Sequence, residues 1–444
     1  MIFFNNKVML QFCIAMLIFI ISLAAAHEPF QEDKKILRSS IDLRDGPGVF
    51  HEWTGRLFKG TVIKLHETEE GWIRISTREY NGWIPDYPEL FDGNESETDE
   101  NDFEGIRHSI YSNFGDEEYD SENSGGFASP TQVAAAVRGF SRQYSIQRAG
   151  ESQSGIELQS LSEIDPRVYR NFKRDRIGRW NRNRAQRRFA ISADDVLLFD
   201  HKNESIGWAV AKRLASEGII QNTEFQNYLS LLGFMITESS HRYDLQMHIY
   251  LMDKESISGY STPAGVIFIA KGAVEFMQSE AELVYFIAHE LAHIQFRHGI
   301  REVEEREVSI KRDEAFVELR QLLADEPGNE EYERVTGELS DWADQVFEYI
   351  VSERLNEYEY AADYWALVYM YRLGYDPGSA LNLLRRIHLE EGGFQREIGT
   401  LEWKGPALEN RIERMLQVFE DHPEFSEQGM INSEVYKNKK EVLR

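Results

Sequence analysis

Cysteine is nearly absent from this sequence of 444 residues. The single cysteine, Cys13, lies in an apolar stretch at the N-terminus. If that stretch is removed on export, the mature chain has neither a disulfide nor thiol chemistry. Its stability then has to come from side-chain packing, to which a bound metal ion would add.

The sequence also lacks a positive charge balance. It carries 76 Asp and Glu against 49 Lys and Arg, which gives a formal net charge of −27 at pH 7. Nucleic-acid binding needs a net basic surface, so this balance argues against a nucleic acid as partner. Internal repeats at solenoid periods are missing as well, which argues against a solenoid. The length and an apolar content of 42% are sufficient for two or three domains with hydrophobic cores.

Residues 1–26 have the pattern of a secretory signal peptide. Lys7 supplies a positive charge, residues 8–23 are apolar, and three alanines that end at Ala26 offer a cleavage site. The chain is therefore expected to be exported to the periplasm or outside the cell, with no transmembrane helix left after cleavage. The alternative is an N-terminal membrane anchor, because residues 8–26 are just long enough to span a bilayer.

Residues 38–91 carry the turn signals of a small all-β domain. A Gly-Pro-Gly turn starts at Gly46, and the Gly-Trp pairs at 71–72 and 82–83 are each followed by isoleucine. This pattern resembles the bacterial SH3 domain, which implies a small barrel that binds a peptide or a cell-wall ligand. The candidate groove aromatics are Trp53, Trp72 and Trp83. The alternative is that these tryptophans fill the small core.

Two segments of opposite charge follow. Residues 92–126 are acidic, with 12 Asp and Glu against one Arg up to position 122, which predicts a disordered linker. Residues 127–191 are predicted to form a helical and Arg-rich connector, with ten Lys and Arg but one Asp between 167 and 188. This basic stretch is either a solvated connector or a dock for the acidic linker or for an anionic envelope surface.

The sequence HELAH at 289–293 has the spacing of a zinc site on a helix. A capping box at 279–282 predicts the start of this helix. His289 and His293 lie one turn apart on the same side, so both imidazoles can reach one Zn²⁺. Glu290 can accept a proton from a water on the metal. The alternative is a core helix that happens to carry two histidines, so a third ligand is needed to decide.

A downstream segment, NEYEYAADYWA at 356–366, offers that ligand. Glu359 and Asp363 are one turn apart in a stretch rich in alanine and aromatic residues, which predicts a buried helix. Buried carboxylates need partners, and zinc together with a ligand histidine would satisfy both. The alternative is a pair of salt-bridged surface acids. Gly374, with a proline shortly after it, predicts the end of this helix.

Three stretches together make the sequence recognisable. The stretch STPAGVIFIAKGAVEFMQSEAELVYFIAHELAHIQFRHG at 261–299, EYAAD at 359–363 and LGYDP at 373–377 resemble the HtpX, BepA and Oma-type zinc metallopeptidases, gluzincins related to the CAAX prenyl protease. The resemblance covers nearly half of the chain. The fold class that it implies is multidomain: the small all-β SH3-like barrel, then a mainly α zincin-type (α+β) metallopeptidase domain with a short edge-strand sheet over 192–420. A polar C-terminal tail over 421–444 completes the expected organisation.

The resemblance also implies roles for the site residues. His289, His293 and Glu359 correspond to the ligands of one Zn²⁺ per chain, and Glu290 corresponds to the general base. Asp363 corresponds to an acid that orients a ligand histidine, in keeping with the general need of a ligand imidazole for an acceptor on its other nitrogen.

Three further features concern the surroundings of the site. The strand at 265–270 corresponds to the active-site edge strand of the family, on which an extended substrate pairs by β-augmentation. His298 belongs to an Arg-His pair frequent in the family, and we expect it to be a histidine at a helix C-terminus, favoured by the helix dipole. The charged residues 300–350 are expected to form a helical insert between the ligands that lids the cleft.

Two departures from the family pattern concern the transition state. Ser258 stands where an asparagine is frequent, and Gly405 stands where a histidine is frequent. Both family side chains lie near the substrate. Tyr260 and Arg411 therefore become the candidate contacts to the transition state or the substrate, and slow turnover is expected.

These features together predict a secreted or periplasmic zinc-dependent endopeptidase. Its partners are protein or peptide substrates, in particular misfolded or envelope proteins, and the SH3-like domain targets it. The alternative is a catalytically weak or inactive peptidase fold that acts as a binding or chaperone module. The intact HExxH motif and third ligand favour an active enzyme.

Overall fold

The computed structural model separates the chain into two compact units. One ends at Glu95, and the other starts at Ser96 and also includes the short segment Gly48–His51. Apart from short gaps, the structure describes residues 33–90, 140–144, 165–177, 201–303, 309–325, 330–351, 356–397 and 408–443. The predicted signal peptide, the acidic linker and Gly405 lie outside these residues.

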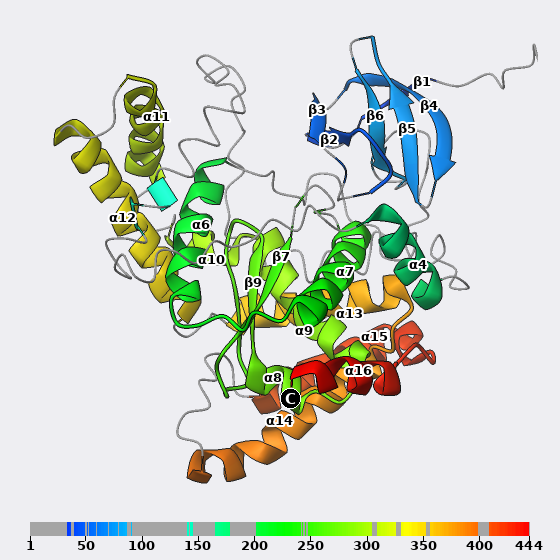
Figure 1. Ribbon diagram of the computed structural model, residues 1–444. Helices are drawn as coiled ribbons and strands as arrows, with labels where there is room; N and C mark the ends of the chain where they lie inside the picture. The colour runs from blue at the N-terminus through cyan, green and yellow to red at the C-terminus, as the bar shows by residue number, and fades with distance from the viewer. Residues whose placement is uncertain are drawn as a thin grey trace, which may run out of the picture. The chain divides into compact units, whose positions relative to one another are not determined.

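The N-terminal unit is an antiparallel sheet of six strands in the order β1-β4-β5-β6-β2-β3 (Figure 1). The strands are β1 (Asp33–Lys35), β2 (Ser40–Arg44), β3 (Trp53–Phe58), β4 (Val62–Glu69), β5 (Trp72–Ser76) and β6 (Asn81–Pro85). Gly60 and Gly71 make the turns on either side of β4 with φ of 83° and 86°, which side chains disfavour. The predicted all-β module is confirmed, but among the described residues it is an open sheet with β1 and β3 at its edges.

The tryptophans predicted to line a groove differ in burial. Trp72 is 1% exposed and belongs to the core of the sheet, so the groove interpretation is wrong for this residue. Trp72 lies on β5, a strand with neighbours on both sides, and it is buried although strand alternation puts it on the face opposite Ile73 and Ile75. Trp83 is half-buried, and the side chain of Trp53 lies outside the described residues.

The C-terminal unit contains a three-stranded sheet made of β7 (His248–Met252), β8 (Gly259–Ser261) and β9 (Val266–Ala270). The order is β7-β9-β8, with β9 parallel to β7 and antiparallel to β8. The predicted edge strand at 265–270 is therefore the central strand. Its unbroken run of five buried apolar residues is typical of a strand covered on both faces. β8 is an edge of this sheet.

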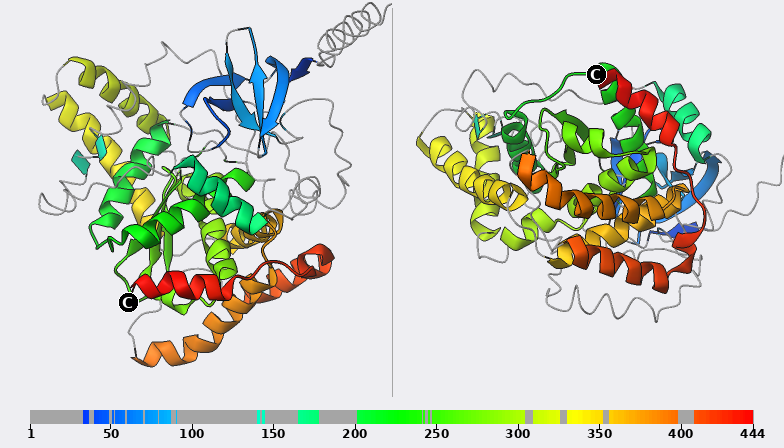
Figure 2. Two further views of the ribbon diagram at one scale, coloured as in Figure 1. Left: turned by 45° about the vertical axis from the view of Figure 1, so that its right-hand side comes forward. Right: turned by 90° about the horizontal axis from the view of Figure 1, so that it is seen from below.

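Helices surround this sheet (Figures 1 and 2). They are α6 (His201–Ala215), α7 (Thr223–Ser239), α8 (Lys271–Phe276), α9 (Glu280–Gln295), α10 (His298–Val303), α11 (Ser309–Asp325), α12 (Glu330–Val351), α13 (Asn356–Leu373), α14 (Gly378–Glu397) and α15 (Leu408–Asp421). The insert at 300–350 is helical, as expected. Its buried residues, such as Trp342, share one hydrophobic cluster with α6 and β9, so α12 is part of the core. No helix among the described residues is long and apolar enough to cross a membrane.

Helices α9 and α13 pack against each other and carry the predicted ligands. Every residue of α9 except Phe286 is buried, including polar residues such as His289 and Glu290, because other elements of the unit pack around the whole helix. α13 ends at Leu373, where Gly374 takes φ of 76°, the left-handed conformation that favours glycine. The predicted end of this helix is confirmed.

The first turn of α9 is capped from two directions. The side chain of Ser279 accepts a hydrogen bond from the N–H of Glu282 at 3.2 Å, as the capping box predicts. The carboxylate of Glu282 accepts from the N–H of Gln278 rather than from that of Ser279. The carbonyl of Ile431 accepts from the N–H of Ala281 at 3.2 Å and so satisfies another group that a helix start leaves unpaired.

The predicted polar tail at 421–444 is instead a packed part of this unit. It forms η5 (Pro423–Ser426), α16 (Ser433–Lys440) and η6 (Glu441–Leu443). Tyr436 is fully buried, and its hydroxyl donates to the carbonyl of Val274 at 2.6 Å. Phe425 is also fully buried. Two apolar anchors in an otherwise polar segment are enough to hold it against the domain, and composition alone did not reveal them.

Helix α4 (Pro166–Ile177) contains part of the Arg-rich stretch and docks two cations on buried carboxylates. Lys173 pairs with Glu238 at 2.5 Å, and Arg176 pairs with Glu280 at 2.7 Å. Both carboxylates are almost fully buried. The interpretation of this stretch as a solvated connector is therefore wrong for Lys173 and Arg176.

Glu280, the first residue of α9, gathers side chains from distant parts of the unit. Besides Arg176, its carboxylate accepts hydrogen bonds from Tyr228 at 2.9 Å, from Tyr375 at 2.7 Å and from Asn432 at 2.7 Å. We call these five residues the Glu280 cluster. It fixes the start of the HExxH helix to α4, α7, the end of α13 and the segment before α16.

Replacing Arg176 by leucine should destabilise the protein by about 3 kcal/mol, the lower end of the cost of breaking a buried ion pair. The charge of Glu280 would stay buried with only neutral donors around it. Arg174→Leu on the exposed side of the same helix is the matched control, with an expected change within about 0.5 kcal/mol. Urea unfolding measures both, and equal midpoint shifts in the two variants would contradict this assignment.

Candidate metal centre

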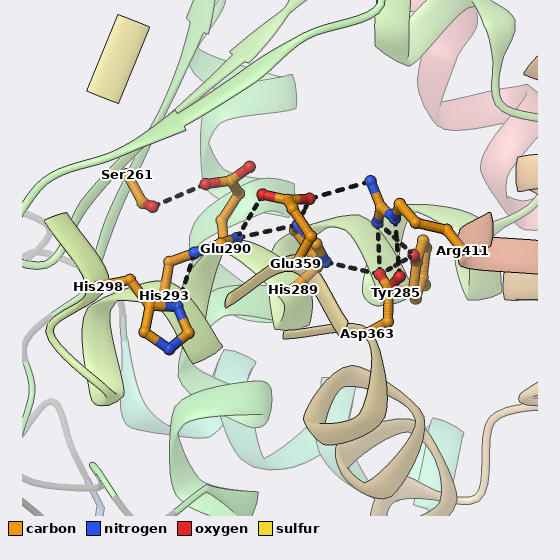
Figure 3. Close-up of polar contacts among 9 residues, drawn as sticks. All are labelled: Ser261, Tyr285, His289, Glu290, His293, His298, Glu359, Asp363 and Arg411. Carbon is orange, nitrogen blue, oxygen red and sulfur yellow. Dashed lines mark hydrogen bonds and ion pairs between the residues drawn. The ribbon is translucent and has the colours of Figure 1, made fainter. Parts of the chain in front are cut away.

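The three predicted ligands converge between α9 and α13. His289 and His293 come from α9 and Glu359 from α13, and all three side chains are buried (Figure 3). The Nε2 atoms of the two histidines are 3.1 Å apart. The carboxylate oxygens of Glu359 lie 3.4 Å from Nε2 of His289 and 3.3 Å from Nε2 of His293.

This spacing fits one zinc ion. Ligand atoms at about 2.0–2.1 Å from a tetrahedral zinc are separated from one another by about 3.3–3.4 Å. The three separations in the cluster are close to that value. Two imidazoles and one carboxylate are also the donor set of many catalytic zinc sites, in which water or substrate takes the fourth position. The cluster is therefore a metal-binding arrangement.

Asp363 lies behind His289, as the sequence predicts. Its Oδ1 atom accepts the Nδ1–H of His289 at 2.9 Å and the hydroxyl of Tyr285 at 2.6 Å. The bond to Nδ1 leaves Nε2 of His289 directed at the cluster. The carboxylate thus selects the tautomer in which this histidine can bind metal.

Arg411 supports the two carboxylates from the other side. Its Nε donates to Asp363 at 2.8 Å, and its Nη1 lies 3.0 Å from Glu359. Burial raises the pKa of both carboxyl groups, but Arg411, with a smaller contribution from His289, outweighs burial and holds each pKa below its usual value. The prediction that Arg411 contacts the transition state directly does not match this geometry. A guanidinium between two buried carboxylates is instead explained by their need for a cation.

Glu290 lies beside the cluster on α9 and is bonded to the edge strand. Its Oε2 accepts a hydrogen bond from the hydroxyl of Ser261 at 2.7 Å (Figure 3). At Gly259, a Cβ atom would lie 2.5 Å from the ring of Phe286 and 3.1 Å from Oε1 of Glu290. A side chain at this position would have to push Phe286 and Glu290 aside, so glycine favours the close approach of β8 to Glu290. Neither of these β8 residues was predicted from the sequence, although they lie two positions apart and thus on one face of the strand.

Tyr260 lies between these two residues and points to the opposite face of β8. It is 6% exposed and belongs to the hydrophobic cluster of α6, α12 and β9. Its ring is also 5.1 Å from the ammonium of Lys254. Strand alternation therefore rules out the predicted contact of Tyr260 with the reacting groups. Ser258, one of the departures from the family pattern, shares a hydrogen bond with Ser256 at 2.8 Å.

His298 contacts the site, contrary to our expectation of a dipole-favoured histidine at a helix C-terminus. It is the first residue of α10, not the last of a helix, and it is 2% exposed. Its Nδ1 lies 2.9 Å from Nδ1 of His293. In the sequence, the Arg-His pair drew attention to His298. The role of this histidine, however, depends on how the chain turns after α9.

The charge environment of His289 predicts how metal binding depends on pH. Burial alone would lower its pKa, but the hydrogen bonds to Asp363 and Glu359 outweigh burial and raise the pKa to about 9 when no metal is bound. The bound proton stabilises the metal-free protein below the ordinary pKa of 6.5, and this contribution is lost as pH rises through about 9. Zinc has to displace that proton.

We therefore expect the apparent zinc affinity to rise about tenfold per pH unit up to about pH 9 and then to level off. Competition with a chelator of known affinity at pH 6.5, 7.5 and 8.5 measures this slope. Asp363→Asn keeps an oxygen that can accept the Nδ1–H of His289 but removes the negative charge that helps to hold the extra proton on this histidine, so it should flatten the dependence. A wild-type affinity that stays constant over this range would contradict the assigned protonation.

Residues 226–426 match the model of peptidase family M48. The chain is 24% identical over 116 residues to the beta-barrel assembly-enhancing protease of Yersinia pestis. It is 20% identical over 118 residues to the protein of the same name from Escherichia coli (strain K12). These matches cover 26% and 27% of this chain, and only 24% of each of the curated relatives.

Proposed function

The chain belongs, over residues 226–426, to peptidase family M48, and we propose that it is an endopeptidase that hydrolyses peptide bonds with one zinc ion per chain. The observation that carries this proposal is the convergence of His289, His293 and Glu359 on one point. Glu290 lies next to that point on the same helix as both histidines. A purely structural metal site would have no use for a carboxylate there that is not itself a ligand.

Zinc in this cluster would polarise the carbonyl of the scissile bond and make a water molecule easier to deprotonate. Glu290 takes the proton from that water and delivers it to the leaving amine. The hydrogen bond from Ser261 fixes one oxygen of Glu290, Oε2, and so orients the carboxylate beside the three ligands. Asp363 and Arg411 keep the ligand side chains in place.

The substrate is proposed to bind as an extended strand along β8. β8 is an edge of its sheet among the described residues, and edge strands recruit extended peptides through backbone hydrogen bonds. Gly259 and Ser261 face Glu290, so a peptide paired with β8 would run past the general base. Folded domains rarely offer a free extended segment, so the favoured substrates are unfolded or flexible proteins.

We also propose that the enzyme acts outside the cytoplasm on misfolded or envelope proteins. Two observations support this: the signal-peptide pattern of residues 1–26 and the relatives whose name refers to β-barrel assembly. The N-terminal sheet is proposed to be SH3-like and to bring the peptidase to a peptide or cell-wall ligand. Among the predicted groove tryptophans we favour Trp83, because its side chain is only half-buried.

Metal removal tests the proposed activity. Purified protein should contain about one zinc per chain and should cleave an unfolded protein such as casein. Treatment with a chelator should remove both the zinc and the cleavage, and added zinc should restore both. Stoichiometric zinc without any cleavage of unfolded proteins would instead identify a binding module on a peptidase fold.

A further inference from the structure

The two ligand histidines are supported in different ways. A metal-bound imidazole uses one nitrogen for the metal and donates the N–H of the other to an acceptor that fixes its tautomer and orientation. For His289 the acceptor is the carboxylate of Asp363. For His293 the group opposite the second nitrogen is a neighbouring imidazole, because Nδ1 of His293 lies 2.9 Å from Nδ1 of His298.

We propose that His298 is a positioning residue that holds His293 ready for metal by accepting its Nδ1–H. Nε2 of His293 faces His289 and Glu359, so the proton of a neutral, metal-binding His293 has to be on Nδ1. His298 accepts that proton when its own N–H is on Nε2. This inference rests on the proposed metal-dependent function and adds a residue to the machinery of the same site.

The backbone takes an unusual conformation to bring His298 to this position. Arg297, between the end of α9 and the start of α10, has φ of 56°. A residue with a side chain seldom takes this left-handed conformation, and it persists only where the surrounding structure enforces it, often at functional sites. Because the chain turns at Arg297, the side chain of His298 lies against that of His293, although His298 is already the first residue of α10.

The ring of His298 is fixed by stacking. It lies parallel to the ring of Tyr358, with centroids 4.2 Å apart and planes 11° apart, and it also stacks on Phe296 at 5.8 Å. Tyr358 directly precedes the ligand Glu359 on α13. His298 therefore joins the two helices that carry the metal ligands, one through a hydrogen bond and the other through ring contact.

The atom that makes the contact allows a sharp test. The amide of asparagine lies about where Nδ1 of histidine lies, whereas the amide of glutamine lies about where Nε2 lies. His298→Asn should thus keep an acceptor for His293, and His298→Gln should not. His298→Leu fills the space with no acceptor at all.

The readouts are the zinc affinity of the full chain, by chelator competition, and the visible absorption spectrum of the cobalt-substituted protein. We expect His298→Leu and His298→Gln to bind zinc about 10–100-fold more weakly, the usual effect of losing such a support. Their cobalt spectra should be altered, whereas His298→Asn should resemble wild type in both readouts. Arg297→Gly, which tolerates the same φ, should leave both unchanged and serves as a control for the turn.

Wild-type affinity and spectrum in His298→Leu would overturn the proposal, as would equal behaviour of the asparagine and glutamine variants. A general packing role for His298 predicts that asparagine and glutamine are equally harmful. These outcomes are separate from the proposed function. If wild type binds zinc and cleaves casein while His298→Leu is unaffected, only the positioning role fails.

Discussion

Replacing Glu290 by glutamine should lower kcat/KM for peptide hydrolysis by about 10²- to 10⁴-fold while the zinc content stays the same. The three ligand atoms come from other side chains, so the cluster keeps its composition. The glutamine amide has nearly the same shape, and its oxygen can still accept the hydrogen bond from Ser261. What it cannot do is take up a proton from water.

The measurement pairs kinetics on a fluorogenic peptide with metal analysis of the same preparation. Glu275→Gln is the matched control, since Glu275 is a glutamate exposed on α8 and paired with Lys271. It should have wild-type kinetics. If Glu290→Gln keeps more than about a tenth of the wild-type rate at full zinc occupancy, another group is the general base.

Replacing Glu359 by alanine should remove the metal and therefore the activity. Its carboxylate lies within 3.4 Å of the Nε2 atoms of both histidines, and two imidazoles alone leave the ion with half of its usual ligands. The loss of affinity should exceed the roughly 10–100-fold expected for a supporting residue such as Asp363. Arg411 would lose the carboxylate that lies 3.0 Å from its Nη1 but would keep its hydrogen bond to Asp363.

Chelator competition and metal analysis measure this loss. Glu357→Ala provides the control on the same helix, because Glu357 is exposed and should bind zinc like wild type. A Glu359→Ala protein that keeps full zinc occupancy would show that the third ligand comes from elsewhere in the chain.

The ligand set could be predicted because its determinants are local. A four-residue spacing places His289 and His293 on one side of a helix, and a carboxylate pair in an apolar helix has to find a partner. Both arguments need only neighbouring residues and burial. The ends of α9 and α13 followed in the same way from a serine cap and from Gly374.

The surroundings of the ligands could not be predicted because they depend on pairing between distant segments. Strand order decided that β9 is central and β8 is the edge, and no local pattern encodes that order. The face of β8 on which Tyr260 lies depends on the pairing register of this strand, because a slip of one residue moves every side chain to the opposite face. Arg411 was predicted to contact the transition state, but its partners are two buried acids that need a cation.

The Glu280 cluster joins parts of the chain that leave the ribosome at different times. Asn432, which donates to Glu280, lies 152 residues further along the chain. At translation rates of roughly 5–20 residues per second, it leaves the ribosome about 8–30 s after the start of the HExxH helix. Until then, the first turn of α9 lacks the carbonyl of Ile431, and the buried charge of Glu280 lacks one of its donors. The candidate ligands are thus synthesised early, whereas the start of their helix is fixed late, so an emerging nascent chain would not yet hold the complete site.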